Sequence, residues 1–112
     1  MIAKTVGLVE PLHRTLHPLA SQIVAAFIYG SIAKGSDTAG SDIDLLIVAD
    51  DVEYPEVFTA LQPAESRLGR SVNPNVMTKR GWQERRRQTD SFVARIAAQP
   101  RLFVIGTEDD IT

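Results

Sequence analysis

Residues 27–48 read FIYGSIAKGSDTAGSDIDLLIV, and this stretch decides the fold. An apolar run over residues 25–29 ends at Gly30-Ser31, which predicts a first strand followed by a sharp corner. A polar, glycine-rich loop leads to residues 41–49, which predict a second strand. The latter half of that strand is apolar on both faces, so we expect it in the interior of a sheet.

The remaining segments predict helices around this pair of strands. We expect a helix over residues 11–22, a helical turn over 32–34, a helix from near Pro55 to Gly69, a strand over 71–78, a helix over 80–99 and a strand over 101–106. Pro63 interrupts one helical pattern and predicts two short pieces. Pro74 cannot donate to a ladder, which predicts a strand that lies at an edge or is bulged there. Together these elements give an α/β (α+β) fold, a mixed sheet with flanking helices in a single domain of residues 1–112.

Composition excludes several classes of protein. The chain has 112 residues, no cysteine and a formal net charge of −2. It therefore has no disulfide or thiolate metal site, and no overall basic field that favours nucleic acid. The sequence contains no apolar stretch of membrane-spanning length and no signal-peptide pattern at its start. We expect a cytoplasmic protein without a membrane partner.

Three charged or titratable groups receive simple structural interpretations. His13 and His17 have helical spacing but no third ligand, so a solvated helix face is the preferred interpretation over a metal pair. The arginines at 85–87 predict a solvated helix face, and the acids at 108–110 a solvated tail.

The two acids at the start of the second predicted strand indicate chemistry. Asp42 and Asp44 are two residues apart, so on a strand both side chains point to one face. Adjacent carboxylates repel unless a cation neutralises them, and Mg²⁺ binds one or two carboxylates together with substrate phosphates. Gly30 and Ser31 offer backbone N–H groups and a hydroxyl to phosphate oxygens, and Lys34 adds a positive charge. The alternative is a solubilising acid pair and an ordinary turn.

At these residues the sequence resembles the minimal nucleotidyltransferases of the DNA polymerase beta superfamily. The family pattern is Gly-Ser, ten intervening residues and Asp-x-Asp. Here Gly30-Ser31 precedes ten residues that end at Ser41, and Asp42-Ile43-Asp44 follows. The resemblance implies a mixed sheet with flanking helices, and ATP or another nucleoside triphosphate with Mg²⁺ as ligands.

The resemblance also implies roles for individual residues. Gly30 and Ser31 would hold the triphosphate, with Lys34 and Ser41 completing the predicted cofactor-binding set. Asp42 and Asp44 would bind the metal ions as catalytic residues. Active members of the family carry a third acid on the next strand.

Asn73 occupies the place of that third acid. Unlike a carboxylate, an amide carries no charge and does not accept a proton. Glu65 and Asp37 are the acids available to replace it.

Two functions remain open on this sequence. The first is an antitoxin-like enzyme that moves AMP or a similar group to an acceptor hydroxyl on a partner protein or another separate acceptor. The second is a catalytically impaired nucleotide-binding module that regulates a partner by binding it, which Asn73 favours. A homo-oligomer is compatible with either.

Overall fold

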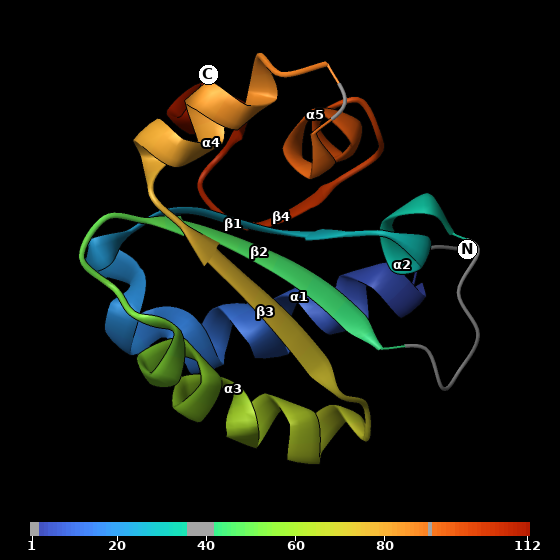
Figure 1. Ribbon diagram of the computed structural model, residues 1–112. Coiled ribbons are helices and arrows are strands. Elements are labelled where there is room, and N and C mark those ends of the chain that lie inside the picture. Colours follow the sequence, from blue (N-terminus) through green and yellow to red (C-terminus); the bar gives the residue numbers. More distant parts are fainter. Residues whose placement is uncertain (1–2, 36–41, 90) are drawn as a thin grey trace.

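A computed structural model describes residues 3–35, 42–89 and 91–112 (Figure 1). In chain order the elements are α1 (Ala3–Leu16), the 3-10 helix η1 (His17–Gln22), β1 (Ile23–Tyr29), α2 (Ser31–Lys34), β2 (Ile43–Ala49), α3 (Tyr54–Leu68), β3 (Val72–Met77), α4 (Lys79–Arg86), α5 (Phe92–Ala97), β4 (Leu102–Ile105) and the 3-10 helix η2 (Glu108–Ile111). No helix in these ranges is both long enough and apolar enough to cross a membrane.

Four strands form one mixed sheet in the order β3-β2-β1-β4. The β1–β2 and β1–β4 pairs are antiparallel, and the β2–β3 pair is parallel. The predicted fold class is confirmed. The second predicted strand lies in the interior as β2, and the strand that contains Pro74 lies at an edge as β3.

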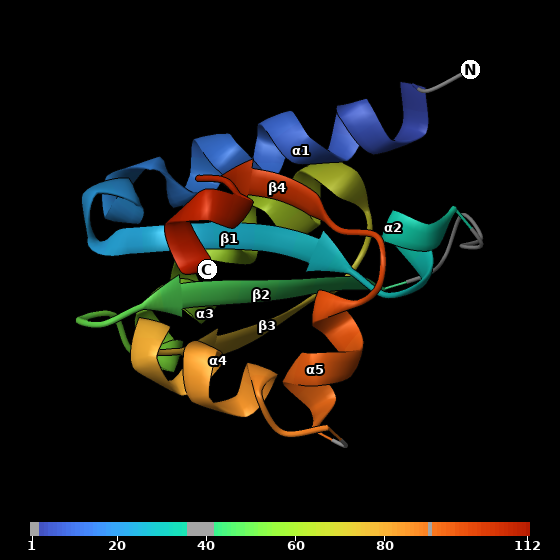
Figure 2. The ribbon, with the colours of Figure 1, turned by 90° about the horizontal axis from the view of Figure 1, so that it is seen from above.

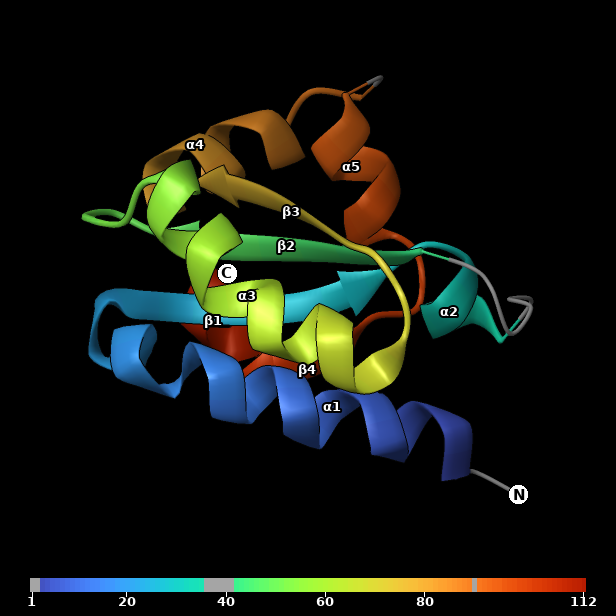
Figure 3. The ribbon, with the colours of Figure 1, turned by 90° about the horizontal axis from the view of Figure 1, so that it is seen from below.

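One face of the sheet packs against α1 and α3, as Figure 3 shows from below. Alternate residues of β2 enter this core, including Ile43, Leu45 and Ile47, where they meet apolar side chains of both helices. The opposite face carries α4, α5 and η2 (Figure 2). Its core centres on Trp82, which is completely buried and contacts the Phe27 ring edge-on, with a centroid distance of 5.5 Å.

Helices α1 and α3 both continue through an internal proline. The sequence instead predicts a helix that begins at residue 11 and a second helix that is divided at Pro63. Helix α1 begins at Ala3 and contains Pro11, and α3 is a single helix that contains Pro63. A proline removes the donor for the carbonyl four residues earlier. Those carbonyls belong to Gly7 and Thr59, both exposed residues, so water can hydrogen-bond to them.

The predicted helix over residues 80–99 is wrong, because two helices occupy that segment. Helix α4 ends at Arg86, and α5 begins after Ser91, whose hydroxyl accepts a hydrogen bond from the Ala94 N–H at 3.0 Å. This cap starts a new helix whose buried residues face the same core as Trp82. Thr78 caps the start of α4, where its hydroxyl accepts a hydrogen bond from the Gly81 N–H at 2.9 Å.

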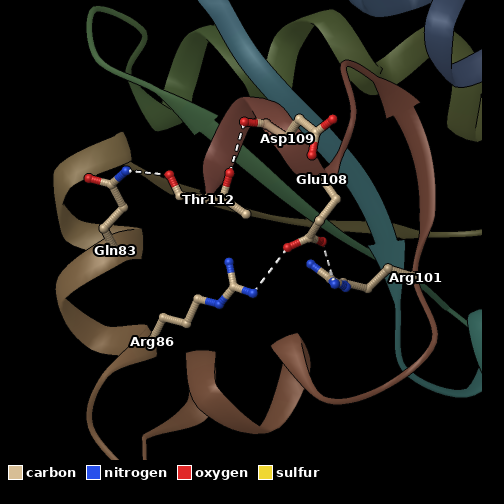
Figure 4. A network of polar contacts seen from close by, with 6 residues as sticks. All are labelled: Gln83, Arg86, Arg101, Glu108, Asp109 and Thr112. Atoms are coloured by element: carbon tan, nitrogen blue, oxygen red, sulfur yellow. Dashed lines mark hydrogen bonds and ion pairs between the residues drawn. The ribbon is translucent and has the colours of Figure 1, made fainter.

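The predicted solvated tail at 108–110 is wrong for Glu108. Its carboxylate forms ion pairs with Arg86 of α4, 3.1 Å away, and with Arg101, 2.5 Å away (Figure 4). Nearby, the Gln83 side chain donates a hydrogen bond to the Thr112 carbonyl at 2.9 Å. These contacts hold η2 between α4 and the segment that enters β4. Asp109 and Asp110 are exposed, as expected.

Glu65 fixes the start of β3 from the neighbouring helix. Its carboxylate accepts a hydrogen bond from the Val72 N–H at 2.7 Å. Directly before this residue, the Ser71 carbonyl accepts from the Ile43 N–H of β2 at 2.8 Å. Because β3 carries Asn73, these two bonds also set where that side chain meets β2.

We expect Glu65→Ala to destabilise the protein by about 1–3 kcal/mol, the cost of leaving a partly buried N–H without its acceptor. Glu65→Gln keeps an acceptor oxygen and should lose less. Thermal unfolding measures both changes, with Ser66→Ala on the exposed side of α3 as the control. Equal melting temperatures for the Ala variant and the wild type would contradict this role.

Candidate active site

The corner after β1 has a backbone that only glycine adopts easily. Gly30 has φ 78° and ψ −151°, a region that side chains with a Cβ avoid. Its carbonyl accepts a hydrogen bond from the Lys34 N–H at 3.1 Å, which closes the single turn of α2. The expected helical turn after the corner is thus confirmed. It begins at Ser31, one residue earlier than predicted.

The corner lies directly against the second acid of the Asp-x-Asp pair. Tyr29, the last residue of β1, pairs with Asp44 across the antiparallel ladder. A Cβ built on Gly30 would lie only 2.7 Å from Asp44 Oδ2. The absence of a side chain at residue 30 therefore makes room for the carboxylate. Asp42 is exposed just before β2, and Asp44 is partly buried within it.

Asn73 lies beside both acids, as its place in the sequence pattern predicts. It pairs with Asp44 in the parallel ladder between β2 and β3. Its side-chain amide donates a hydrogen bond to Asp42 Oδ2 at 3.3 Å and also interacts with the Asp44 carboxylate. Asn73 is therefore a neutral donor to the carboxylates in this structure.

Burial shifts two titratable groups at this end of the sheet. Partial burial raises the pKa of Asp44 above 3.8; the hydrogen bond from Asn73 opposes the shift, and the charge of Asp42 adds to it. Burial also raises the pKa of Tyr29 above 10.0, so this phenol is neutral at pH 7. The Tyr29 hydroxyl accepts a hydrogen bond from the Asn75 side chain at 3.4 Å.

The other candidate residues have different positions. Lys34 is exposed at the end of α2, and Ser31 begins that helix. Ser41 and Asp37 lie outside the described residues. Glu65 does not replace the third acid, because it binds the Val72 N–H on the side of α3.

The two histidines lie on the surface near the end of α1. His13 and His17 are both exposed, which agrees with the preferred interpretation of a solvated surface. They do not share one α-helix, because α1 ends between them at Leu16. No cluster of three or more His, Cys, Asp or Glu residues in the described ranges could hold a metal ion.

Two surface hollows lie away from the carboxylates. One, of about 500 Å³, is lined by residues of α4 and η2 with Thr112, and the other, of about 630 Å³, lies between α1 and α3. Neither is lined by Asp42, Asp44 or Asn73. The chemistry of the acid pair, rather than the size of a cavity, therefore identifies the candidate site.

A family model described as "Polymerase beta, Nucleotidyltransferase" matches residues 13–78, more than half of the chain. The chain belongs to this nucleotidyltransferase family. The matched range contains the Gly30 corner, both acids and Asn73. No curated protein matches the sequence.

Several solved structures share the nucleotidyltransferase fold. A toxin-antitoxin structure with AMP-PNP is 17% identical with a TM-score of 0.64, over 91% of this chain and 76% of that one. A complex of a tri-AMPylated Shewanella oneidensis HEPN toxin with an MNT antitoxin is 15% identical with a TM-score of 0.59, over 95% and 76%. An MntA-HepT toxin-antitoxin structure is 15% identical with a TM-score of 0.57, over 94% and 75%. At these identities the likeness shows the fold alone.

The acid pair of this nucleotidyltransferase domain fits a hard cation such as Mg²⁺. Asp42 and Asp44 supply carboxylate oxygens, and the space left by Gly30 is on the side of Asp44 Oδ2. Mg²⁺ accepts one or two carboxylates when substrate phosphates and water complete its coordination. Two acids without a third are therefore sufficient for a site of this kind.

We expect Gly30→Ala to destabilise the domain by about 1–3 kcal/mol through backbone strain, with a further loss from the contact with Asp44. Gly30→Ala in an Asp44→Ala background is the control, because it keeps the backbone of residue 30, with φ 78° and ψ −151°, and removes the carboxylate. Chemical unfolding compares the loss caused by Gly30→Ala in the two backgrounds. An equal loss in both would show that the contact with Asp44 contributes nothing.

We expect Asp44→Asn to raise the Tm by up to about 3 °C at pH 7 in metal-free buffer. The raised pKa of Asp44 means that its charged form is less favourable in the folded than in the unfolded state. This penalty is complete above the folded-state pKa and disappears as the pH falls below the unfolded value near 3.8. Thermal melts against pH test the effect, with Asp51→Asn as the exposed control. If Asp44→Asn still raised the Tm at a pH below 3.8, the charge on Asp44 could not be the cause of the gain.

Proposed function

We propose that the chain is a Mg²⁺-dependent nucleotidyltransferase that moves AMP or a similar group from a nucleoside triphosphate to an acceptor hydroxyl. The observation that carries the proposal is the contact between the Gly30 corner and the Asp44 carboxylate, with Asp42 beside it. Family membership supports the same reaction class.

Each residue has a defined part in this proposal. Gly30 and Ser31 bind the triphosphate through backbone N–H groups and the hydroxyl, and Lys34 and Ser41 contribute charge and polarity nearby. Asp42 and Asp44 hold Mg²⁺, which when bound neutralises charge on the transferring phosphate. The acceptor oxygen bonds to the α-phosphorus as the bond to the bridging oxygen breaks, and pyrophosphate leaves. Asn73 orients both carboxylates but takes no proton, so the acceptor's proton leaves to solvent or to the acceptor's own surroundings.

The acceptor is a hydroxyl of a partner protein. The site lies at one end of the sheet, where Asp42 and Asn73 are exposed and accessible to another molecule. Structural neighbours include toxin-antitoxin complexes, one of them with an AMPylated toxin. We propose an antitoxin-like role on this basis.

A second function is a nucleotide-binding module with little or no turnover. The observation that favours it is the hydrogen bond from Asn73 to Asp42, made where active members of the family carry a third acid. Such a module would regulate its partner through binding alone.

Calorimetry with ATP and Mg²⁺ tests the shared basis of both functions. We expect the wild type to bind MgATP, and Asp42→Ala combined with Asp44→Ala to weaken binding at least ~10-fold, because the cation loses both carboxylates. Asp51→Ala combined with Asp109→Ala is the matched control, because both acids are exposed and lie outside the site. No binding by the wild type at millimolar MgATP would refute both functions.

Transfer of label from α-labelled ATP to protein in a cell lysate separates the two functions. We expect transfer by the wild type, abolished in the double Ala variant, and a rate increase of about 10-fold or more in Asn73→Asp, because a carboxylate adds a proton acceptor. Nucleotide binding without transfer by the wild type, together with transfer by Asn73→Asp, would favour the binding module instead.

A further inference from the structure

We propose that Phe92 is the surface on which the base of the bound nucleotide stacks, with Tyr29 supporting it from behind. The inference rests on the proposed function and extends it from the phosphates to the base. It makes Phe92 a specificity-determining residue that selects an aromatic base, and purines over pyrimidines.

The position of α5 brings Phe92 to the candidate site. Tyr29 and Asp44 are directly paired across the ladder, so their side chains are on the same face of the sheet, about 5 Å apart at Cβ. The Phe92 ring meets the Tyr29 ring edge-to-face, with centroids 5.7 Å apart. Figure 2 shows α5 over the end of the sheet where β1 ends and β2 begins. Phe92 is thus one aromatic ring away from the acid pair.

Phe92 is one of three exposed large apolar residues in the part of the chain that the structure describes. Its exposed fraction is 43%, whereas Val93 and Ile96 on the same helix are buried. Only Tyr54, Phe58 and Phe92 are large exposed apolar residues within the described ranges, and Phe92 is the one on the face that carries Asp44. An exposed aromatic ring beside a nucleotide site provides a surface for a flat base.

The backbone that carries Phe92 is fixed before any ligand binds. Ser91 caps α5 by accepting a hydrogen bond from the Ala94 N–H, and its own hydroxyl donates to the Arg85 carbonyl. The Tyr29 ring behind Phe92 is held at its hydroxyl by Asn75. The start of α5 and the supporting ring therefore need little ordering when a base stacks on Phe92, which lowers the entropy cost of binding.

The chemistry of stacking sets the expected selectivity. Every base has a π-face, so an aromatic platform tolerates all of them and favours those with the larger stacking surface. Selection by stacking alone therefore ranks ATP and GTP together, above UTP and CTP.

Binding of nucleotides and of inorganic tripolyphosphate to Phe92→Ala tests the proposal. We expect MgATP affinity to fall by ~10-fold, within a range of about 5- to 100-fold for loss of one stacked base. Magnesium tripolyphosphate, which has no base, should bind with unchanged affinity. The preference for ATP over UTP should disappear. Unchanged MgATP affinity, or an equal loss for both ligands, would overturn the proposal.

Phe58→Ala is the matched control. Phe58 is exposed to nearly the same extent, 45%, but lies on α3 against the opposite face of the sheet. It should leave both affinities unchanged. If the wild type binds no nucleotide at all, the proposed function fails; if it binds MgATP and Phe92→Ala binds equally well, only the stacking proposal fails.

Phe92→Trp gives a second measurement that does not depend on removing the ring. This variant keeps a platform, so we expect MgATP affinity to be retained within about 3-fold or improved. Its indole is exposed whereas Trp82 is fully buried, so MgATP should quench the added fluorescence and tripolyphosphate should not. Equal responses to both ligands would overturn the placement of the base on residue 92.

Discussion

The close approach of the Asp44 carboxylate to Gly30 constrains the rest of the molecule. It requires the β1–β2 ladder to pair Tyr29 with Asp44, and it requires a backbone at residue 30 that glycine adopts without strain. That register is held because β2 packs apolar side chains on both of its faces. A shift by one residue would move the acid into the α1–α3 core and expose the apolar residues that now fill it. Two separate cores thus fix the position of one carboxylate.

Much of the candidate site could be predicted from the sequence because its parts are local or follow a fixed spacing. The Gly30 corner and the acids at 42 and 44 lie on one continuous stretch, and strand geometry relates them directly. Asn73 could be placed through the family pattern, which puts a third acid on the next strand, and Pro74 predicts that this strand lies at an edge or is bulged. The family pattern supplied the roles, which the geometry alone does not give.

What could not be predicted depends on long-range packing. The apolar positions of residues 80–99 fit one helix, and only the cap at Ser91 shows the break between α4 and α5. That break brings Phe92 of α5 against Tyr29 of β1, a contact between distant parts of the chain that the sequence does not indicate. The fold brings Glu108 against Arg86 and Arg101, and the residues next to Glu108 in the sequence do not indicate these ion pairs.

The start of β3 has a consequence for behaviour at high concentration. Backbone N–H groups two residues apart in a strand point to the same side, so the outward side of this edge includes Val72 and Pro74. Glu65 already occupies the Val72 donor, and proline has none. A strand from another molecule would therefore find no donor at either position. The first half of this edge is therefore a poor template for intermolecular β-pairing, which disfavours aggregation by strand addition there.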